Sequence, residues 1–183
     1  QSISMRIISG QFGGRRFSPP KNLPVRPTTD QAKEALFNIF NNNFDFENIK
    51  VLDLFAGTGS ISFEFASRGV SSITSVDQNY NCCSFIKSTA EQLGVSLHVQ
   101  KSDVFKWVEN NKGRKFDLIF ADPPYDLKNL KDIPELIFKN EVLSENGWFV
   151  LEHPREYKFA EHANFKEHRN YGNVNFSVFG SQL

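Results

Sequence analysis

The stretch that decides the fold is Val51–Ser60, which has the sequence Val-Leu-Asp-Leu-Phe-Ala-Gly-Thr-Gly-Ser. A short apolar run that ends in a Gly-x-Gly turn before an amphipathic segment is typical of a buried parallel strand leading into a helix. Gly57 and Gly59 allow backbone angles that a Cβ would forbid, and they let a ligand approach the main chain closely. The stretch therefore predicts an α/β fold with a ligand site at the end of this strand.

The absence of two nucleotide-binding motifs from the turn narrows the class of ligand. A dinucleotide fingerprint needs a third glycine three residues after Gly59, where this chain has Ser62, and a phosphate-binding loop needs Gly-Lys before Ser or Thr. The turn thus favours a nucleoside without a pyrophosphate. Asp77 ends the next expected strand, 24 residues after Asp53 (77 − 53), where it could accept hydrogen bonds from both ribose hydroxyls.

A second motif, Asp122-Pro123-Pro124-Tyr125, directly follows the apolar run 116–121. The prolines fix the backbone, so the carbonyl beside them keeps a set direction. A carboxylate beside a rigid carbonyl suits an amine on a heteroaromatic ring. Such an amine is a weak nucleophile because its lone pair is delocalised into the ring. Two acceptors that take hydrogen bonds from its N–H groups expose that lone pair. Tyr125 offers a face for stacking an extruded base. The alternative is a proline turn with a solvated aspartate, but a site after a parallel strand favours ligand binding.

In this order the motifs resemble those of Rossmann-like S-adenosylmethionine (SAM) dependent methyltransferases that act on exocyclic amines. The resemblance is to the RsmD family, which methylates guanine N2 in 16S ribosomal RNA, and it covers nearly the whole chain. It implies a class I methyltransferase fold, with a mostly parallel seven-stranded sheet whose last strand is antiparallel and a small β-rich N-terminal extension. Ser9 departs from the family pattern, which has a second glycine there. Further segments that carry the resemblance are Arg6–Gly10, Gly14–Arg16, Arg26–Thr28, Glu34–Ile39 and Tyr171-Gly172.

The resemblance also implies roles for particular residues. Asp122 and the carbonyl of Pro123 would hold the amine, Pro124 would stiffen the turn, and Tyr125 would stack the base. Asp103 would bind the adenine of SAM, although it could instead cap the following helix. Whether Asp122 also removes a proton is left open, and no metal is required. The residues expected to contact SAM are Asp53, Phe55, Ala56, Gly57, Thr58, Gly59, Asp77, Gln78, Asp103 and Val104.

The charge is unevenly distributed although the net charge is zero. Residues 1–33 hold six basic side chains against Asp30 alone, so the remainder is acidic. This favours an arm that contacts RNA phosphates, with a merely solvated arm as the alternative. The resemblance implies that the partner is 16S rRNA within a small ribosomal subunit or an assembly intermediate. The candidate phosphate contacts are Arg6, Arg15, Arg16 and Arg26.

Residues 1–28 are basic and turn-rich and are expected to form an N-terminal extension, and the resemblance implies one methyltransferase domain over 29–183. Gln1 to Ser4 precede the only methionine and are expected to be vector-derived. Strands are expected at 5–9, 50–55, 72–77, 96–100, 116–121 and 147–152, with a hairpin of 165–169 and 173–179. Helices are expected at 29–41, 60–68, 80–93, about 104–111 and 127–139.

The 183 residues contain no apolar run long enough to span a membrane and no signal-peptide pattern, so a cytoplasmic location is expected. Nothing in the sequence demands a dimer, and we expect a monomer. The adjacent Cys82 and Cys83 suit neither a disulfide nor a metal site, and the four histidines show no ligand spacing.

Other functions are compatible with parts of this pattern. A DNA methyltransferase acting on adenine N6 or cytosine N4 uses the same tetrad, but it generally needs a large target-recognition region. Protein glutamine methyltransferases usually carry asparagine in place of Asp122. A binding module without turnover would bind SAM and RNA and transfer nothing.

Overall fold

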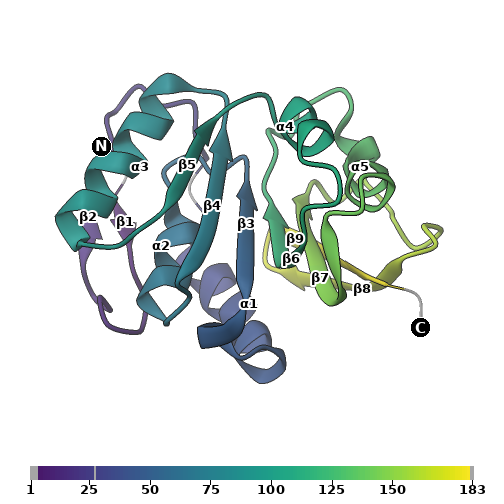
Figure 1. The fold of residues 1–183 in the computed structure, drawn as a ribbon, viewed down its shortest axis with the longest axis horizontal. Coiled ribbons are helices and arrows are strands. Elements are labelled where there is room, and N and C mark those ends of the chain that lie inside the picture. The colour runs from purple at the N-terminus through teal and green to yellow at the C-terminus, as the bar shows by residue number, and fades with distance from the viewer. Residues whose placement is uncertain (1–3, 27, 182–183) are drawn as a thin grey trace.

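A computed structural model describes residues 4–26 and 28–181. Its centre is a seven-stranded sheet in the order β5-β4-β3-β6-β7-β9-β8 (Figure 1). The pairs from β5 to β7 are parallel, whereas β9 runs antiparallel to both β7 and β8. This confirms the expected fold class. The strands are β3 (Lys50–Leu54), β4 (Ser72–Asp77), β5 (His98–Lys101), β6 (Phe116–Ala121), β7 (Leu143–His153), β8 (Phe165–Tyr171) and β9 (Val174–Gly180).

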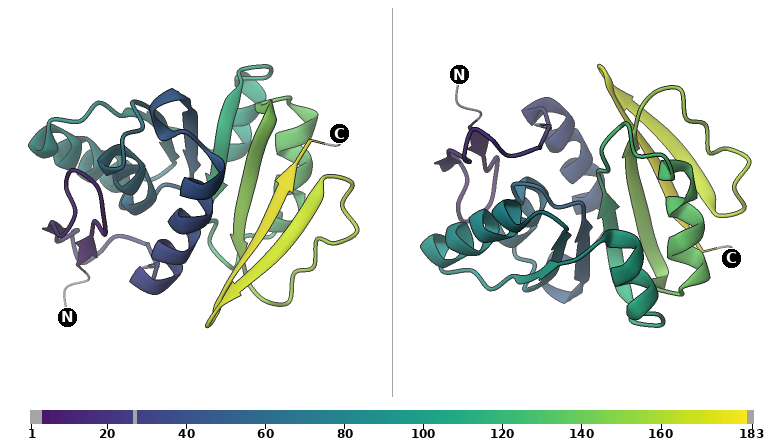
Figure 2. Two further views of the ribbon diagram at one scale, coloured as in Figure 1. Left: turned by 90° about the horizontal axis from the view of Figure 1, so that it is seen from below. Right: turned by 90° about the horizontal axis from the view of Figure 1, so that it is seen from above.

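Helices cover both faces of the sheet (Figures 1 and 2). Along β3, Val51 packs in the same apolar cluster as α1 and α2, whereas Leu52 packs with α4 and α5, as the alternation of strand side chains requires. Both residues are fully buried. The helices are α1 (Asp30–Asn43), α2 (Ser60–Ser67), α3 (Tyr80–Leu93), α4 (Val104–Asn110) and α5 (Ile133–Lys139), with 3-10 turns η1 (Phe46–Asn48) and η2 (Leu130–Asp132).

Residues 4–26 form the N-terminal segment, which packs against the sheet domain through buried contacts. Met5 and Ile7 pack against α2 and α3, and the Glu64 carboxylate in α2 accepts hydrogen bonds from the backbone N–H groups of Ile8 and Ser9 at 2.9 and 3.1 Å. Lys33 forms an ion pair with Glu64 at 3.3 Å. The segment contains a two-stranded antiparallel sheet of β1 (Met5–Arg6) and β2 (Arg16–Phe17), so the strand expected at 5–9 is shorter than predicted and β2 was not predicted.

The region before β7 also differs from the sequence prediction. The α-helix expected over 127–139 begins only at Ile133, after the turn η2. Pro134 lacks a backbone N–H and therefore fits only the first turn of a helix, which fixes the start of α5 there. Strand β7 begins at Leu143, four residues before the expected Gly147.

The sheet order creates a switch point between β3 and β6. The chain moves outward from β3 through β4 to β5, then crosses back to β6 and continues in the opposite direction. Ligands of open α/β sheets bind outside the carboxyl ends of the strands at such a point. None of the described helices is long and apolar enough to cross a lipid bilayer.

Candidate active site

The turn after β3 is shaped by its backbone. Phe55, Gly57 and Gly59 all have positive φ angles, of 58°, 58° and 80°. A positive φ is unfavourable for a residue with a side chain such as Phe55, and strain of this kind is common at ligand sites. A Cβ on Gly59 would lie 2.8 Å from the Phe63 ring, so glycine is required there. The result is a tight turn in which Gly59 is buried and the N–H groups of Gly57 and Gly59 donate to Asp77 and to the Ala56 carbonyl.

Asp77 holds this turn in place. Its Oδ2 accepts a hydrogen bond from the Gly57 N–H at 2.9 Å, and its Oδ1 accepts one from the Asn79 N–H at 2.8 Å. Each carboxylate oxygen can accept a further bond, so Asp77 retains capacity for ribose hydroxyls. Gln78 beside it is exposed. The ribose role of Asp77 stays a prediction, and the geometry is compatible with it.

Asp53 lies beneath the turn and is buried. Its Oδ2 accepts a hydrogen bond from the Ser62 hydroxyl at 2.6 Å, and Ser62 lies 2.7 Å from the hydroxyl of Ser75. Burial raises the pKa of Asp53 to about 7. This aspartate therefore links β3 to α2, in addition to the contact with SAM that the sequence predicts. Three other predicted contacts in the turn are half-buried: Phe55, Ala56 and Thr58.

Asp103 caps α4, which is the alternative role that the sequence left open. Its Oδ1 accepts a hydrogen bond from the Lys106 N–H at 3.0 Å. The side chain is exposed, so its contact with adenine stays a prediction. The neighbouring Val104 is buried in the apolar cluster between α4 and the sheet.

The Asp122–Tyr125 tetrad follows β6 and lies next to the glycine turn. Leu54 pairs with Ala121 in the parallel register, and the Asp122 N–H donates to the Leu54 carbonyl at 3.4 Å. Both motifs therefore stand at the same edge of the sheet, at the switch point. Pro123 is buried and Pro124 is exposed. The two halves of the predicted site are brought together as the sequence indicated.

Three side chains from two segments, Asp122, Tyr125 and Glu152, form an acceptor cluster that holds the side chain of Arg26 from a third segment. The Arg26 Nη2 donates to Asp122 Oδ1 and, at 2.6 Å, to Glu152 Oε2. The Arg26 Cζ lies 3.7 Å from the centroid of the Tyr125 ring, and the Tyr125 hydroxyl donates to Glu152 Oε2 at 3.3 Å. A planar cation is therefore stacked on the tyrosine and held by two carboxyl groups.

Burial dominates the electrostatics of this cluster. The Glu152 side chain is 3% exposed, and burial together with the neighbouring Asp122 raises the pKa of Glu152 to about 9. Burial also raises the pKa of Asp122, although Arg26 acts in the opposite direction. Burial and Glu152 raise the pKa of Tyr125 to about 12, so its hydroxyl remains a donor. Among the described residues, Glu152 Oε1 is buried without a hydrogen-bond partner.

The family follows from comparison with known proteins. A family model described as conserved hypothetical protein 95 matches residues 5–180. The chain belongs to this family. The "Putative rRNA methyltransferase YlbH" of Bacillus subtilis (strain 168) is 36% identical over 161 residues, which cover 86% of each protein. The "Ribosomal RNA small subunit methyltransferase D" of Escherichia coli (strain K12) is 30% identical over 82% of this chain and 72% of that protein.

The fold is also shared with a solved structure. The Escherichia coli protein yhhF superposes with a TM-score of 0.82 at 25% identity, covering 98% of this chain and 99% of that one. Together with the relatives above, this confirms the RsmD-family resemblance that the motifs indicated.

The predicted arginines occupy different environments. Arg15 and Arg16 are exposed near the turn before β2, as a phosphate-binding arm requires. Arg6 pairs with Asp30 at 2.9 Å. Arg26 is turned toward the acceptor cluster, a position that its sequence context did not reveal. Their contact with RNA stays a prediction.

Glu152 was missed by the sequence analysis. It follows Leu151, which pairs with Ala121, so the β6–β7 register sets Glu152 beside Asp122. The signal was present, because Glu152 ends an apolar strand, just as Asp77 and Asp122 stand at the ends of theirs. An acidic residue at that position of a parallel strand predicts a place in the ligand site, as it does for Asp77 and Asp122.

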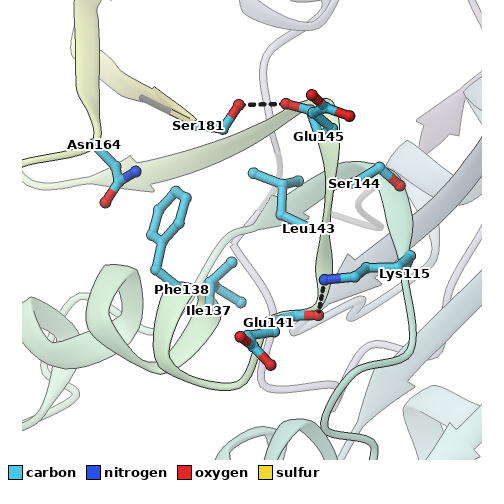
Figure 3. Close-up of a pocket in the computed structure, with 9 residues that line it drawn as sticks. All are labelled: Lys115, Ile137, Phe138, Glu141, Leu143, Ser144, Glu145, Asn164 and Ser181. Carbon is cyan, nitrogen blue, oxygen red and sulfur yellow. Dashed lines mark hydrogen bonds between the residues drawn. The ribbon is translucent and has the colours of Figure 1, made fainter. Parts of the chain in front are cut away.

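A separate pocket of about 180 Å³ lies away from this site (Figure 3). Lys115 and Leu143 line it at the amino ends of β6 and β7, opposite to the edge that carries the tetrad. Its polar groups are partly satisfied, since Lys115 Nζ donates to the Glu141 carbonyl at 2.8 Å. It contributes nothing to the candidate site.

Proposed function

We propose that this chain transfers a methyl group from SAM to the exocyclic N2 amine of a guanine in small-subunit ribosomal RNA. The observation that carries the proposal is the contact between the two motifs at the switch point, where Asp122 donates its N–H to Leu54 at the base of the glycine turn. The names of the Escherichia coli and Bacillus subtilis relatives support an rRNA substrate.

The residues on the β3–β5 side suit SAM. A Cβ on Gly57 would lie 3.1 Å from Val25 and one on Gly59 would lie 2.8 Å from Phe63, so the two glycines let the turn pack closely against the surrounding side chains. Asp77 and Asp103 offer acceptors for ribose and adenine. When bound, SAM supplies a methyl group on a positively charged sulfur, which is already reactive. The protein therefore contributes chiefly alignment, which can lower a barrier by roughly 7 to 11 kcal/mol.

The residues on the β6–β7 side suit an aromatic amine. Tyr125 stacks the base, and Asp122 with the Pro123 carbonyl accepts the two amine hydrogens. This arrangement draws the amine lone pair out of the ring and directs it toward the glycine turn. The raised pKa of Asp122 makes it able to hold the proton that the amine loses.

The N-terminal segment supplies the RNA contacts in this proposal. Arg15 and Arg16 are exposed and would bind phosphates that flank the target, which offsets the few kcal/mol needed to extrude a base. Replacing both with glutamine should weaken RNA binding and lower its salt dependence, with the exposed Arg155→Gln as the control. The protein would act as a monomer in the cytoplasm on a small subunit or an assembly intermediate.

The proposal is tested by methyl transfer to undermethylated small subunits, with duplex DNA as the competing substrate. We expect incorporation into the subunits and none into DNA, and Asp122→Ala should reduce incorporation by roughly 10²-fold or more while SAM binding persists. Full transfer by Asp122→Ala would refute the mechanism. Preferential labelling of DNA would instead favour an adenine N6 or cytosine N4 methyltransferase.

A further inference from the structure

The Arg26 side chain shows what kind of group the acceptor cluster binds. A guanidinium is a planar carbon bonded to three nitrogens. One of these nitrogens, Nη2, donates to both Asp122 and Glu152, while the guanidinium carbon lies 3.7 Å from the Tyr125 ring centroid. The cluster thus holds an amino group between two carboxylates with its parent plane stacked on an aromatic face. That is the placement a methyl-accepting base requires.

Guanine contains the same chemical unit. Its C2 carbon is bonded to N1, N2 and N3, so its exocyclic amine stands beside a ring N–H. In adenine and cytosine the ring nitrogen next to the amine carries no hydrogen and is an acceptor. Among the four common RNA bases, only guanine therefore presents an amine and a neighbouring ring donor on one edge.

Glu152 has an acceptor atom left over for that ring donor. Its Oε2 accepts from Arg26 and Tyr125, but Oε1 has no partner among the described residues although the side chain is 3% exposed. A buried polar atom without a partner is costly and calls for an explanation. A guanine that placed N2–H on one oxygen of Glu152 and N1–H on the other would satisfy both, as arginine and carboxylate groups do in bidentate pairs.

We propose that Glu152 selects guanine by accepting hydrogen bonds from N1–H and from one N2–H, in place of the Pro123 carbonyl, while Asp122 accepts the second N2 hydrogen. The Arg26 guanidinium occupies this receptor until the base displaces it. This inference rests on the proposed function and adds to it the residue that discriminates between bases.

If Glu152 were protonated with the base bound, the preference for a base with a ring N–H would be reversed. Burial and Asp122 raise the pKa of Glu152 to about 9, whereas Arg26 acts to lower this pKa, so displacement of Arg26 does not by itself favour the ionised form. A Glu152 that stayed protonated with the base bound would donate to the ring nitrogen, and so would favour a base with an acceptor there. Base preference therefore distinguishes the two states.

The test compares guanine with 2-aminopurine at the modified position of small-subunit RNA, once that position is mapped. The analogue keeps the 2-amino group but has an acceptor at N1. We expect the wild-type kcat/KM to fall by about 100-fold with 2-aminopurine, because Glu152 would face a ring acceptor instead of a donor. Equal rates with both bases would refute the inference alone. No transfer to guanine would refute the proposed function as well.

The Glu152→Gln variant separates recognition from the intrinsic reactivity of the two bases. Glutamine can donate to the N1 acceptor of 2-aminopurine, so the guanine preference should shrink at least about tenfold relative to wild type. Glu156→Gln removes an exposed carboxylate nearby in the chain and should leave the preference unchanged. An unchanged preference in a folded, SAM-binding Glu152→Gln would overturn the proposal. If this variant does not fold, the wild-type comparison decides.

Discussion

The carboxyl ends of the parallel strands form one edge of the sheet, here called the carboxyl edge, and its two halves are built differently. On the β3–β5 side, two of the carboxylates accept from backbone N–H groups that lie at most 20 positions away along the chain: Asp77 from Gly57 and Asn79, and Asp103 from Lys106. On the β6–β7 side, Asp122 and Glu152 bond to Arg26, which lies 96 and 126 positions away along the chain. The cofactor half is thus shaped by main chain and glycine, and the acceptor half by side chains from distant segments.

This difference implies that the halves respond differently to substitution. In the cofactor half the atoms that form the site also form the turn, so a change there should alter folding and SAM binding together. In the acceptor half Asp122 and Tyr125 follow β6 and Glu152 lies near the end of β7, so a change of these side chains should alter the reaction and leave the fold largely intact.

The largest effect on stability is expected from Gly59→Ala. Its φ of 80° is unfavourable for alanine and the added Cβ would lie 2.8 Å from Phe63, so we expect a loss of about 2 to 4 kcal/mol in unfolding free energy, together with SAM affinity. Gly57→Ala is the matched control, because the closest atom to its Cβ would belong to Val25, at 3.1 Å, and it should lose less. Denaturant unfolding and calorimetric SAM titration measure both. Equal losses would contradict the steric account.

A smaller effect, confined to the reaction, is expected from Tyr125→Ala. Loss of base stacking should lower kcat/KM by a factor equivalent to about 1 to 3 kcal/mol, with SAM affinity unchanged. Tyr125→Phe keeps the ring and loses only the 3.3 Å hydrogen bond to Glu152, so it should retain most activity. If phenylalanine were as damaging as alanine, the hydroxyl rather than the ring face would be the essential group.

The smallest effect is expected in the pH dependence of stability. Burial raises the pKa of Asp53 to about 7, so the folded protein binds a proton that the unfolded chain releases above its ordinary pKa of about 4. The stabilisation from this proton is complete below about pH 4 and is lost as the pH rises through about 7, with a slope of up to about 1.4 kcal/mol per pH unit. Asp53→Asn should flatten this decline, whereas Asp126→Asn at an exposed site should not. Parallel curves for Asp53→Asn and wild type would contradict the assignment.

The contrast between the halves also explains what sequence could predict. The strands, the glycine turn and the tetrad were recognisable because local pattern determines them: 116–121 and 72–77 match β6 and β4 in the structure. The position of Arg26 was not recognisable, since nothing in its neighbourhood indicates a partner 96 residues away. The competing role of Asp103 was foreseen because capping is also a local pattern.

The boundaries of the helices were likewise predictable only where a local pattern determines them. Helix α3 ends at Leu93, as the expected range 80–93 predicted, and the φ of 69° at the following Gly94 suits glycine. Helix α5 begins later than expected because its apolar periodicity continues back through Leu130 into η2, and periodicity alone does not distinguish the two kinds of turn. The pairing of β1 with β2 depends on a chain reversal without a distinctive motif.

The most direct test of the whole account is nucleoside analysis of undermethylated small-subunit RNA after incubation with the protein and labelled SAM. If the carboxyl edge joins a SAM turn to a guanine receptor, the label will appear as N2-methylguanosine at one position. Label found on adenine, on cytosine or on ribosomal protein would contradict it.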